Sequence, residues 1–194
     1  NGKLTFNNGG TINIYGGSGT SYWSSNGDAN IKMNGGVLDF KDHGINIYNT
    51  TTYSFTQEIT GGTIRANGDF KCYRSNFTPT GLTLELTGNK NAQLNMTAGV
   101  LHNLIINKPS NIPMVLMSNI IINGNLNINS GTFKLNPGTI LKSNNINLAN
   151  NTTLLVTEGA KIRIKPSKSL ISNGGFIKIE GTPSNKALIE ASET

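Results

Sequence analysis

The second half of the chain repeats short segments in which apolar and polar residues alternate. From residue 124 onward, apolar pairs two residues apart recur at Leu126/Ile128, Phe133/Leu135, Ile146/Leu148, Leu154/Val156, Ile162/Ile164 and Ile177/Ile179. A period of two places these side chains on one face of a strand and their mainly Asn, Thr, Lys and Arg neighbours on the other. Turn-forming residues such as Ser130-Gly131 and Pro137-Gly138 separate the pairs. The pattern therefore predicts short strands joined by tight turns.

The strands recur about every seven to eight residues, and three such steps give a period of about 22 residues, which is typical of solenoids. We therefore predict an all-β fold, a right-handed parallel β-helix (β-solenoid) with about 8–9 coils of roughly 20–25 residues. The handedness follows the general preference of parallel connections. The residues expected to point into the core include Ile128, Leu135, Leu148, Val156, Ile164 and Ile179. A meander β-sandwich that serves as a binding module, with antiparallel strands, stays open as an alternative.

The first half of the chain follows the same idea less regularly. Variants of one phrase begin at Gly9, Gly35, Gly61 and Gly81, about 20 to 26 residues apart, which suggests one coil each. We predict a single solenoid over residues 1–194, with irregular coils at 1–97, a protruding Gly/Ser-rich loop at 16–28 and regular coils at 98–194. The chain opens in the middle of a pattern, so we expect it to be a fragment of a longer polypeptide.

Composition narrows the class of protein further. The chain has 30 Asn and 23 Gly but only 13% charged residues, which argues against a helical protein and against disorder driven by charge. No apolar run is long enough to span a membrane. The net charge of +6 lies mainly in residues 98–194, where Lys161, Arg163 and Lys165 alternate with isoleucines. This spacing indicates the solvent face of a strand, so we do not expect a nucleic-acid partner.

Several segments carry a resemblance to known proteins. Residues 61–70 read GGTIRANGDF, residues 77–88 FTPTGLTLELTG and residues 101–107 LHNLIIN. This succession resembles the repeat regions of very large bacterial surface proteins exported by the type IX secretion route. Residues 174–189, GGFIKIEGTPSNKALI, look like a phrase common in right-handed parallel β-helix proteins of similar exported type. The resemblance provides no catalytic motif to carry over.

The resemblance implies a bacterial, extracellular or cell-surface location and a group of proteins that includes adhesins, filaments and polysaccharide-active enzymes. We expect a structural or adhesive segment of an exported cell-surface or filament-forming protein. Its expected partners are a glycan or another cell-surface molecule, the rest of a longer polypeptide, and other copies through lateral self-association. The alternative is a polysaccharide lyase or glycoside hydrolase domain of parallel β-helix type.

The candidate catalytic residues come from one acidic cluster. Asp39, Asp42 and His43 could supply two carboxylates and an imidazole for acid–base chemistry, or ligands for Ca²⁺. The same residues also fit a turn that leaves a strand, and on that interpretation no cofactor or metal is expected. The single cysteine, Cys72, shares a strand face with Phe70, which predicts a buried thiol.

The candidate binding residues lie in the expected loop. Eleven of the thirteen aromatic residues precede residue 78, and Tyr22 and Trp23 occupy the Gly/Ser-rich segment. Exposed aromatic rings stack on sugar rings, and a nearby carboxylate such as Asp28 supplies hydrogen bonds. A loop that folds back to cover the solenoid is the alternative interpretation. If this segment has a function of its own, we expect it in the first half of the chain.

Overall fold

The structure, a computed structural model, describes residues 2–6, 9–15, 20–23, 28–109 and 111–192, with the backbone alone described at 2–6 and 20–23. This part of the chain contains no helix and forms twenty strands. They are β1 (Gly2–Phe6), β2 (Thr11–Ile14), β3 (Thr20–Trp23), β4 (Ala29–Phe40), β5 (Gly44–Ile47), β6 (Phe55–Ala66), β7 (Phe70–Cys72), β8 (Thr83–Thr87), β9 (Ala92–Met96), β10 (Val100–Leu101), β11 (Asn103–Asn107), β12 (Met114–Leu116), β13 (Ile120–Ser130), β14 (Thr132–Leu135), β15 (Ile140–Leu148), β16 (Thr153–Val156), β17 (Lys161–Ile164), β18 (Leu170–Ser172), β19 (Phe176–Ile179) and β20 (Leu188–Ala191).

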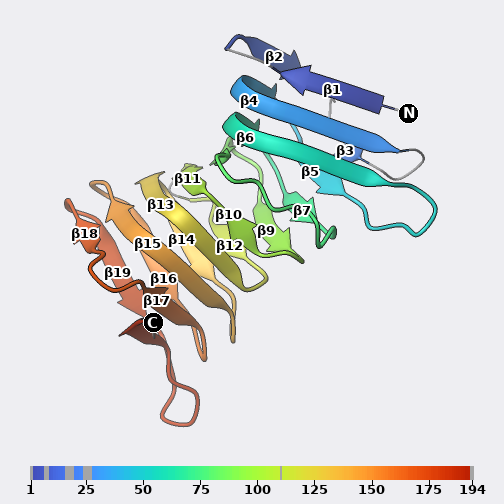
Figure 1. Cartoon of the computed structure of the whole chain (residues 1–194). Coiled ribbons are helices and arrows are strands. Elements are labelled where there is room, and N and C mark those ends of the chain that lie inside the picture. The colour runs from blue at the N-terminus through green and yellow to red at the C-terminus, as the bar shows by residue number, and fades with distance from the viewer. Residues whose placement is uncertain (1, 7–8, 16–19, 24–27, 110, 193–194) are drawn as a thin grey trace.

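The strands form two stacked parallel sheets (Figure 1). The larger sheet has the order β1-β4-β6-β8-β11-β13-β15-β17-β20, with β2, β10 and β18 paired beside β4, β13 and β15. The smaller sheet has the order β19-β16-β14-β12-β9-β7-β5-β3. Every strand pair among the described residues is parallel, for example β4 with β6 and β14 with β16. The prediction of a parallel β-solenoid is confirmed, and the antiparallel sandwich alternative is wrong.

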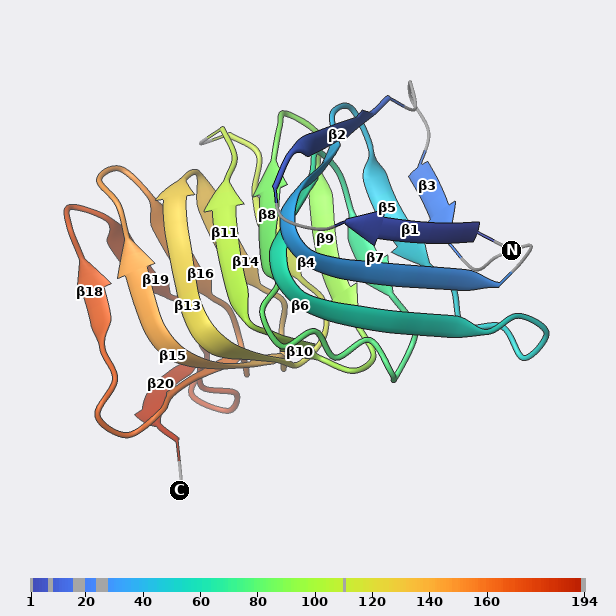
Figure 2. The same cartoon turned by 45° about the horizontal axis from the view of Figure 1, so that its top comes forward.

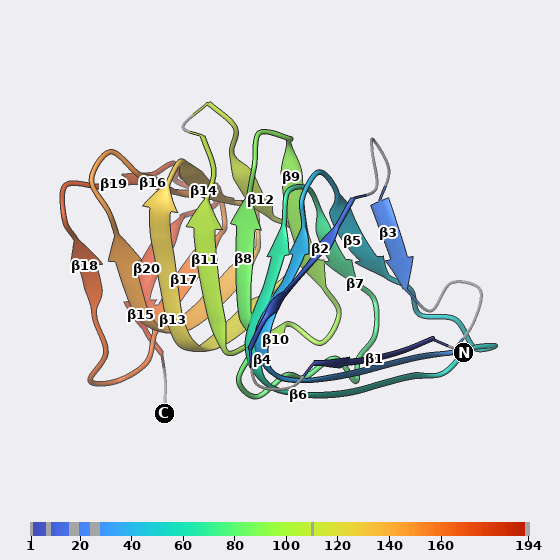
Figure 3. The ribbon, with the colours of Figure 1, turned by 90° about the horizontal axis from the view of Figure 1, so that it is seen from above.

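Each turn of the solenoid has three sides. The long strands β4, β6, β13 and β15 bend around a corner, so the larger sheet supplies two sides and the smaller sheet the third (Figures 2 and 3). At the bend of β4 the pairing with β6 shifts register on both sides of Asn34. Gly36, two residues later, has a φ of 72°, in the left-handed region that glycine adopts without steric cost. The Gly-Gly phrases of the sequence therefore include corners of the solenoid.

The solenoid has about seven turns, slightly fewer than the 8–9 coils predicted. The length of a turn varies along the chain. Leu38 pairs with Ile64, 26 residues later, whereas Leu84 pairs with Leu104, only 20 residues later. Near the end of the stack, Ile162 pairs with Ile189, 27 residues later. The right-handed sense of the solenoid stays a prediction.

The core consists of apolar columns that run from turn to turn. Leu84, Leu104, Leu126 and Ile146 stack in register on the larger sheet and are fully buried. The predicted core residues Ile128, Leu135, Leu148 and Val156 are also fully buried. Two predicted core residues differ from expectation: Ile164 is only partly buried and Ile179 is 54% exposed. Ile179 pairs with Val156 on one side, and among the described residues no strand pairs with the other side of β19.

The expected loop at 16–28 is wrong in part. Thr20–Trp23 forms strand β3, which pairs in parallel with β5 of the smaller sheet. Regular pairing therefore extends into the segment that the Gly/Ser content marked as a loop. Among the described residues, no helix is both long and apolar enough to cross a membrane.

Candidate functional site

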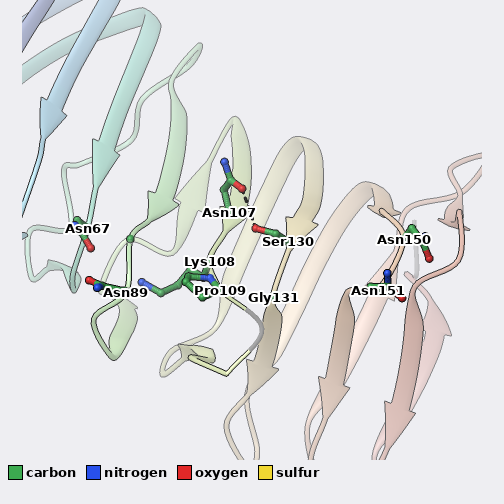
Figure 4. Close-up of a pocket in the computed structure, with 10 residues that line it drawn as sticks. Asn67, Asn89, Asn107, Lys108, Pro109, Ser130, Gly131, Asn150 and Asn151 are labelled. Carbon is green, nitrogen blue, oxygen red and sulfur yellow. Dashed lines mark hydrogen bonds between the residues drawn. The ribbon is translucent and has the colours of Figure 1, made fainter.

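The described residues form a groove along one corner of the solenoid. It has a volume of about 750 Å³ and crosses the turns that follow β6, β8, β11, β13 and β15 (Figure 4). We call it the amide groove; it is lined by Asn67, Gly88, Asn89, Asn107, Lys108, Pro109, Ser130, Gly131, Asn150 and Asn151. Because successive parallel strands lie about 4.8 Å apart, five turns present their corner residues over about 20 Å.

Asparagine and glycine form this corner for a steric reason. The side-chain amide of Asn67 packs directly on Gly88, at a position where a Cβ atom on residue 88 would overlap it. Gly88 also has a φ of 74°, which side-chain-bearing residues rarely adopt. The same arrangement recurs at the end of the groove, where the amide of Asn150 packs on Gly174 in the following turn. Asparagine in one turn and glycine in the next therefore allow the corner to stack closely.

Some polar side chains of the groove form hydrogen bonds within the protein, and others can form hydrogen bonds with a ligand. Ser130 Oγ donates to Asn107 Oδ1 over 2.8 Å, and Asn107 Nδ2 donates to Glu85 Oε1 over 3.3 Å. The side-chain amides of the exposed residues Asn89 and Asn151 have no hydrogen-bond partner among the described residues. Figure 4 shows Asn89 near one end of the groove and Asn151 near the other. These two amides can donate and accept hydrogen bonds with a ligand.

Lys108 is the single titratable side chain in the lining of the amide groove. It is fully buried, and its Nζ donates to the carbonyl oxygen of Thr87 over 2.7 Å. Burial lowers the pKa of Lys108 to about 8, although the negative charge of Asp69 acts in the opposite direction. Among the described residues, the rest of the lining offers amide, hydroxyl and backbone groups. These groups can exchange hydrogen bonds with a polar ligand.

Asp39, the first of the predicted catalytic residues, is engaged in ion pairs. Asp39 has a side chain only 3% exposed, and its Oδ2 accepts Lys41 Nζ at 2.6 Å and a nitrogen of Arg65 at 3.0 Å. The continuing contact from Arg65 to Glu85 makes this an ion-pair column across three turns. Asp39 therefore balances neighbouring cations and is not presented to solvent.

Asp42 and His43 do lie together. Asp42 Oδ1 is 2.7 Å from His43 Nδ1, but the His43 side chain is only 1% exposed and packs edge-on against Phe40. Among the described residues, no group of three or more His, Cys, Asp or Glu side chains is arranged to hold a metal ion. The pair occupies the turn between β4 and β5, as the turn interpretation predicts.

The predicted ligand-binding residues are described only in part. The backbones of Tyr22 and Trp23 lie in β3, but their side chains are outside the described residues. Asp28 Oδ1 accepts the backbone N–H of Ser54 over 2.7 Å, and this hydrogen bond lowers the pKa of the carboxyl. Asp28 thus links one turn to the next. The structure describes no contact that joins it to Tyr22 or Trp23.

Cys72 has the environment that the sequence predicts. It is fully buried, and burial raises the pKa of its thiol to about 12. A thiol with so high a pKa stays protonated at neutral pH, and a protonated thiol is a poor nucleophile. Cys72 is a core residue.

The amide groove was not predicted from the sequence, although asparagines recur near the ends of strands. Asn67, Asn89, Asn107 and Asn150 each stand at or just beyond the end of a strand. Period-two alternation identifies the strands, but it does not reveal that their ends come together along one corner. Only the register of the turns aligns these residues.

The parallel β-solenoid confirms the fold that the resemblance to type IX surface proteins implied. The resemblance to that family has no other support. Comparison with protein-family models, curated proteins and solved structures finds no match to this chain.

Proposed function

We propose that the chain is a structural and adhesive segment of an exported bacterial cell-surface or filament-forming protein, and that it holds glycans in the amide groove. The observation that carries the proposal is the lining of the groove, which among the described residues consists mainly of amide, hydroxyl and backbone groups together with one lysine. Sugar hydroxyls both donate and accept hydrogen bonds, as do asparagine side chains. A groove that extends along several turns suits an extended chain more than a compact small molecule.

The fold supports a load-bearing role. Each turn pairs through its backbone with the turns on either side, and a continuous apolar core runs through the stack. In such an architecture each unit contacts mainly its neighbours, so the length can grow without a new type of core. A stiff rod that carries a binding groove on one corner fits a stalk or an adhesin.

The binding part is tested with an array of neutral glycans and the double variant Asn89→Ala/Asn151→Ala. These amides are exposed and have no partner among the described residues. Because Asn151 has a φ of 58°, which alanine adopts only with strain, chemical denaturation first checks that the double variant is folded. We expect wild type to bind at least one neutral oligosaccharide and the double variant to bind it about tenfold more weakly, as for the loss of one or two hydrogen bonds. Asn49→Ala, at an exposed asparagine outside the groove, is the matched control.

Binding by the double variant at wild-type strength would refute the groove as the site. The Tyr22→Ala/Trp23→Ala variant belongs in the same screen, because these aromatics remain the second candidate for glycan contact. A loss confined to that variant would move the site to the first turn. If no array glycan binds wild type or any variant, the adhesive part of the proposal is wrong.

The surface location has its own test. The full-length protein in intact bacteria should be cut by added protease and labelled by antibodies against this segment. Cleavage only after the cells are broken would contradict the location. This outcome is independent of glycan binding.

The alternative function, a polysaccharide lyase or glycoside hydrolase, has one observation in its favour. The contact between Asp42 and His43 provides a carboxylate–imidazole pair of the kind used in acid–base catalysis. The pair is tested by reducing-end and unsaturated-product assays on acidic polysaccharides. Activity in wild type that His43→Gln and Asp42→Asn abolish would favour this alternative over a purely adhesive role.

A further inference from the structure

Several charged side chains on the outside of the solenoid stand beside opposite charges in the next turn. Lys32 on β4 is in register with Glu58 on β6, and Arg163 on β17 is in register with Glu190 on β20. Their ion-pair distances are 2.8 and 2.6 Å. Adjacent strands lie about 4.8 Å apart, so each residue acts directly on the residue in register with it. The surface charge is therefore balanced from turn to turn at these positions.

Lys142 on β15 instead stands beside a like charge. The residues in register with it are Ile121 on β13 and Arg163 on β17, an aliphatic side chain and a second cation. None of the ion pairs between described residues includes Lys142. Like charges in register destabilise a sheet pair. An anion placed between Lys142 and Arg163 would remove this repulsion.

A hollow of about 330 Å³ lies at this position, on a different part of the surface from the amide groove. Its lining includes two cations, Lys142 and Arg163, the aliphatic residues Ile121 and Ile140, and the polar residues Asn119 and Thr97. Asn119 Oδ1 accepts the backbone N–H of Ile140 over 2.8 Å, which fixes the amide at the edge of the hollow. Arg163 uses only its Nε with Glu190, and its other nitrogens have no partner within the described part of the chain.

We propose that this hollow, the Lys142 pocket, binds a carboxylate-bearing sugar unit. Lys142 and Arg163 hold the carboxylate through charge-assisted hydrogen bonds, the strongest type available on a protein surface. The aliphatic surfaces of Ile121 and Ile140 pack against the C–H face of the sugar ring. Thr97 and the amide of Asn119 contact ring hydroxyls. The volume suits a single small unit rather than a large ligand.

The inference rests on the proposed contact with glycans but concerns a second site with a different charge. The amide groove is lined mainly by neutral groups, whereas the Lys142 pocket presents two cations. A glycan that carries both neutral and acidic units could engage both sites. The two sites can be disabled separately.

The test measures binding of a galacturonic acid oligosaccharide and of its fully methyl-esterified form by calorimetry at low ionic strength. We expect wild type to bind the acid form, and Lys142→Ala to bind it about tenfold more weakly, as for the loss of one charge-assisted hydrogen bond. The methyl ester should bind wild type about as weakly as the acid form binds Lys142→Ala. Glu190→Gln should tighten binding of the acid form, because it frees Arg163 from its ion pair.

Lys134→Ala is the matched control, because Lys134 is also an outward lysine and stands in register with Val115 and Leu155. It removes the same charge and should bind as wild type does. An equal loss in Lys134→Ala and Lys142→Ala, equal binding of the acid and the ester, or no binding by wild type would overturn the proposal. The Asn89→Ala/Asn151→Ala variant should keep its affinity for the acid form. Binding of neutral glycans without binding of the acid form would refute the Lys142 pocket and leave the amide groove standing.

Discussion

Among single residues, Lys108 has the environment least typical of its type. Its side chain is fully buried, and its described partner is the carbonyl oxygen of Thr87, a neutral group. A neutral partner does not compensate the loss of water around an ammonium group. Burial therefore lowers the pKa of Lys108 from 10.5 to about 8. Folding is coupled to the release of this proton.

The coupling predicts a rise of stability with pH. Between pH 8 and pH 10.5 the folded chain has released the proton of Lys108, whereas the unfolded chain still binds it. Through Lys108 the unfolded state binds more protons in this window, so this group makes the free energy of unfolding increase with pH. Above pH 9 the thiol of Cys72, whose pKa burial raises from 9.0 to about 12, acts in the opposite direction, so the net rise is expected between pH 8 and pH 9. Below pH 8 both states are protonated, and the cost of the buried charge is constant. Urea denaturation at several pH values across the window measures the slope.

Lys108→Met should lose this rise, because the methionine carries no proton. Comparing slopes rather than absolute stabilities avoids the separate effect of the hydrogen bond to Thr87. Lys134→Met changes a lysine that is only half-buried and should keep the rise. If Lys108→Met retains the wild-type slope, Lys108 is not the titrating group.

The sequence predicts the burial and contacts of a residue well where they depend on alternation within one strand. It predicts them poorly where they depend on the residues of the neighbouring turn. Leu148 and Val156 were expected in the core because they alternate with polar residues, and both are fully buried. The same pattern at Ile179 predicts burial, yet a side chain is buried only if strands stack on it. Asp39 appeared as a candidate acid because Arg65, its partner, lies 26 residues away. A contact at that distance in sequence depends on the register, which alternation does not fix.

At the scale of elements, the ion-pair column from Asp39 through Arg65 to Glu85 joins strands β4, β6 and β8. Arg65 donates from Nε to Glu85 over 2.7 Å and from a terminal nitrogen to Asp39 over 3.0 Å. The hydrogen bond to Glu85 is the main cause that raises the pKa of Arg65. The Asp39 and Glu85 side chains are only 3% and 13% exposed. Asp39 also pairs with Lys41, whereas Arg65 is the ion-pair partner of Glu85 among the described residues.

Arg65→Met should lower the free energy of unfolding by about 2–4 kcal/mol, because it leaves a nearly buried carboxylate on each side without this partner. Lys32→Met is the matched control. Its pair with Glu58 is 43% and 62% exposed, and exposed pairs contribute only about 0–1 kcal/mol. Chemical denaturation of the three proteins at pH 7 compares them. Equal losses in the two variants would show that burial of the column does not matter.

Alternation of apolar and polar residues predicted some strands correctly and failed to predict others. Alternation identifies strands such as Phe133–Leu135 and Leu154–Val156, and both lie in observed strands. The Gly/Ser-rich segment around residue 20 predicted a loop, but Thr20–Trp23 pairs with β5. The strand contains Thr, Tyr and Trp, which are residue types enriched in strands, so the glycines and serines around it hid a short strand signal.

For the whole molecule, the position of a residue along the stack of turns should determine how much its side chain contributes to the free energy of unfolding. Leu126 lies between Leu104 and Ile146 in register and is fully buried. Ile177 lies in register with Leu154 on one side, and its side chain is 37% exposed. A solenoid is stabilised by contacts between neighbouring turns, so a turn with one neighbour opens more easily than a turn with two. Figure 1 shows β19 at the end of the stack and β13 well inside it.

This difference predicts two distinct responses to the same loss of side-chain volume. Leu126→Ala should lower the free energy of unfolding by about 2–5 kcal/mol, because it leaves a cavity between two turns that cannot close on it. Ile177→Ala should cost only about 1 kcal/mol, since part of the side chain is already in water. Hydrogen exchange gives a second measurement: backbone amides of β19 should exchange faster than those of β14, and Ile177→Ala should accelerate β19 alone. Uniform exchange along the chain, or equal costs for the two substitutions, would mean that the stack unfolds as one cooperative unit and not turn by turn.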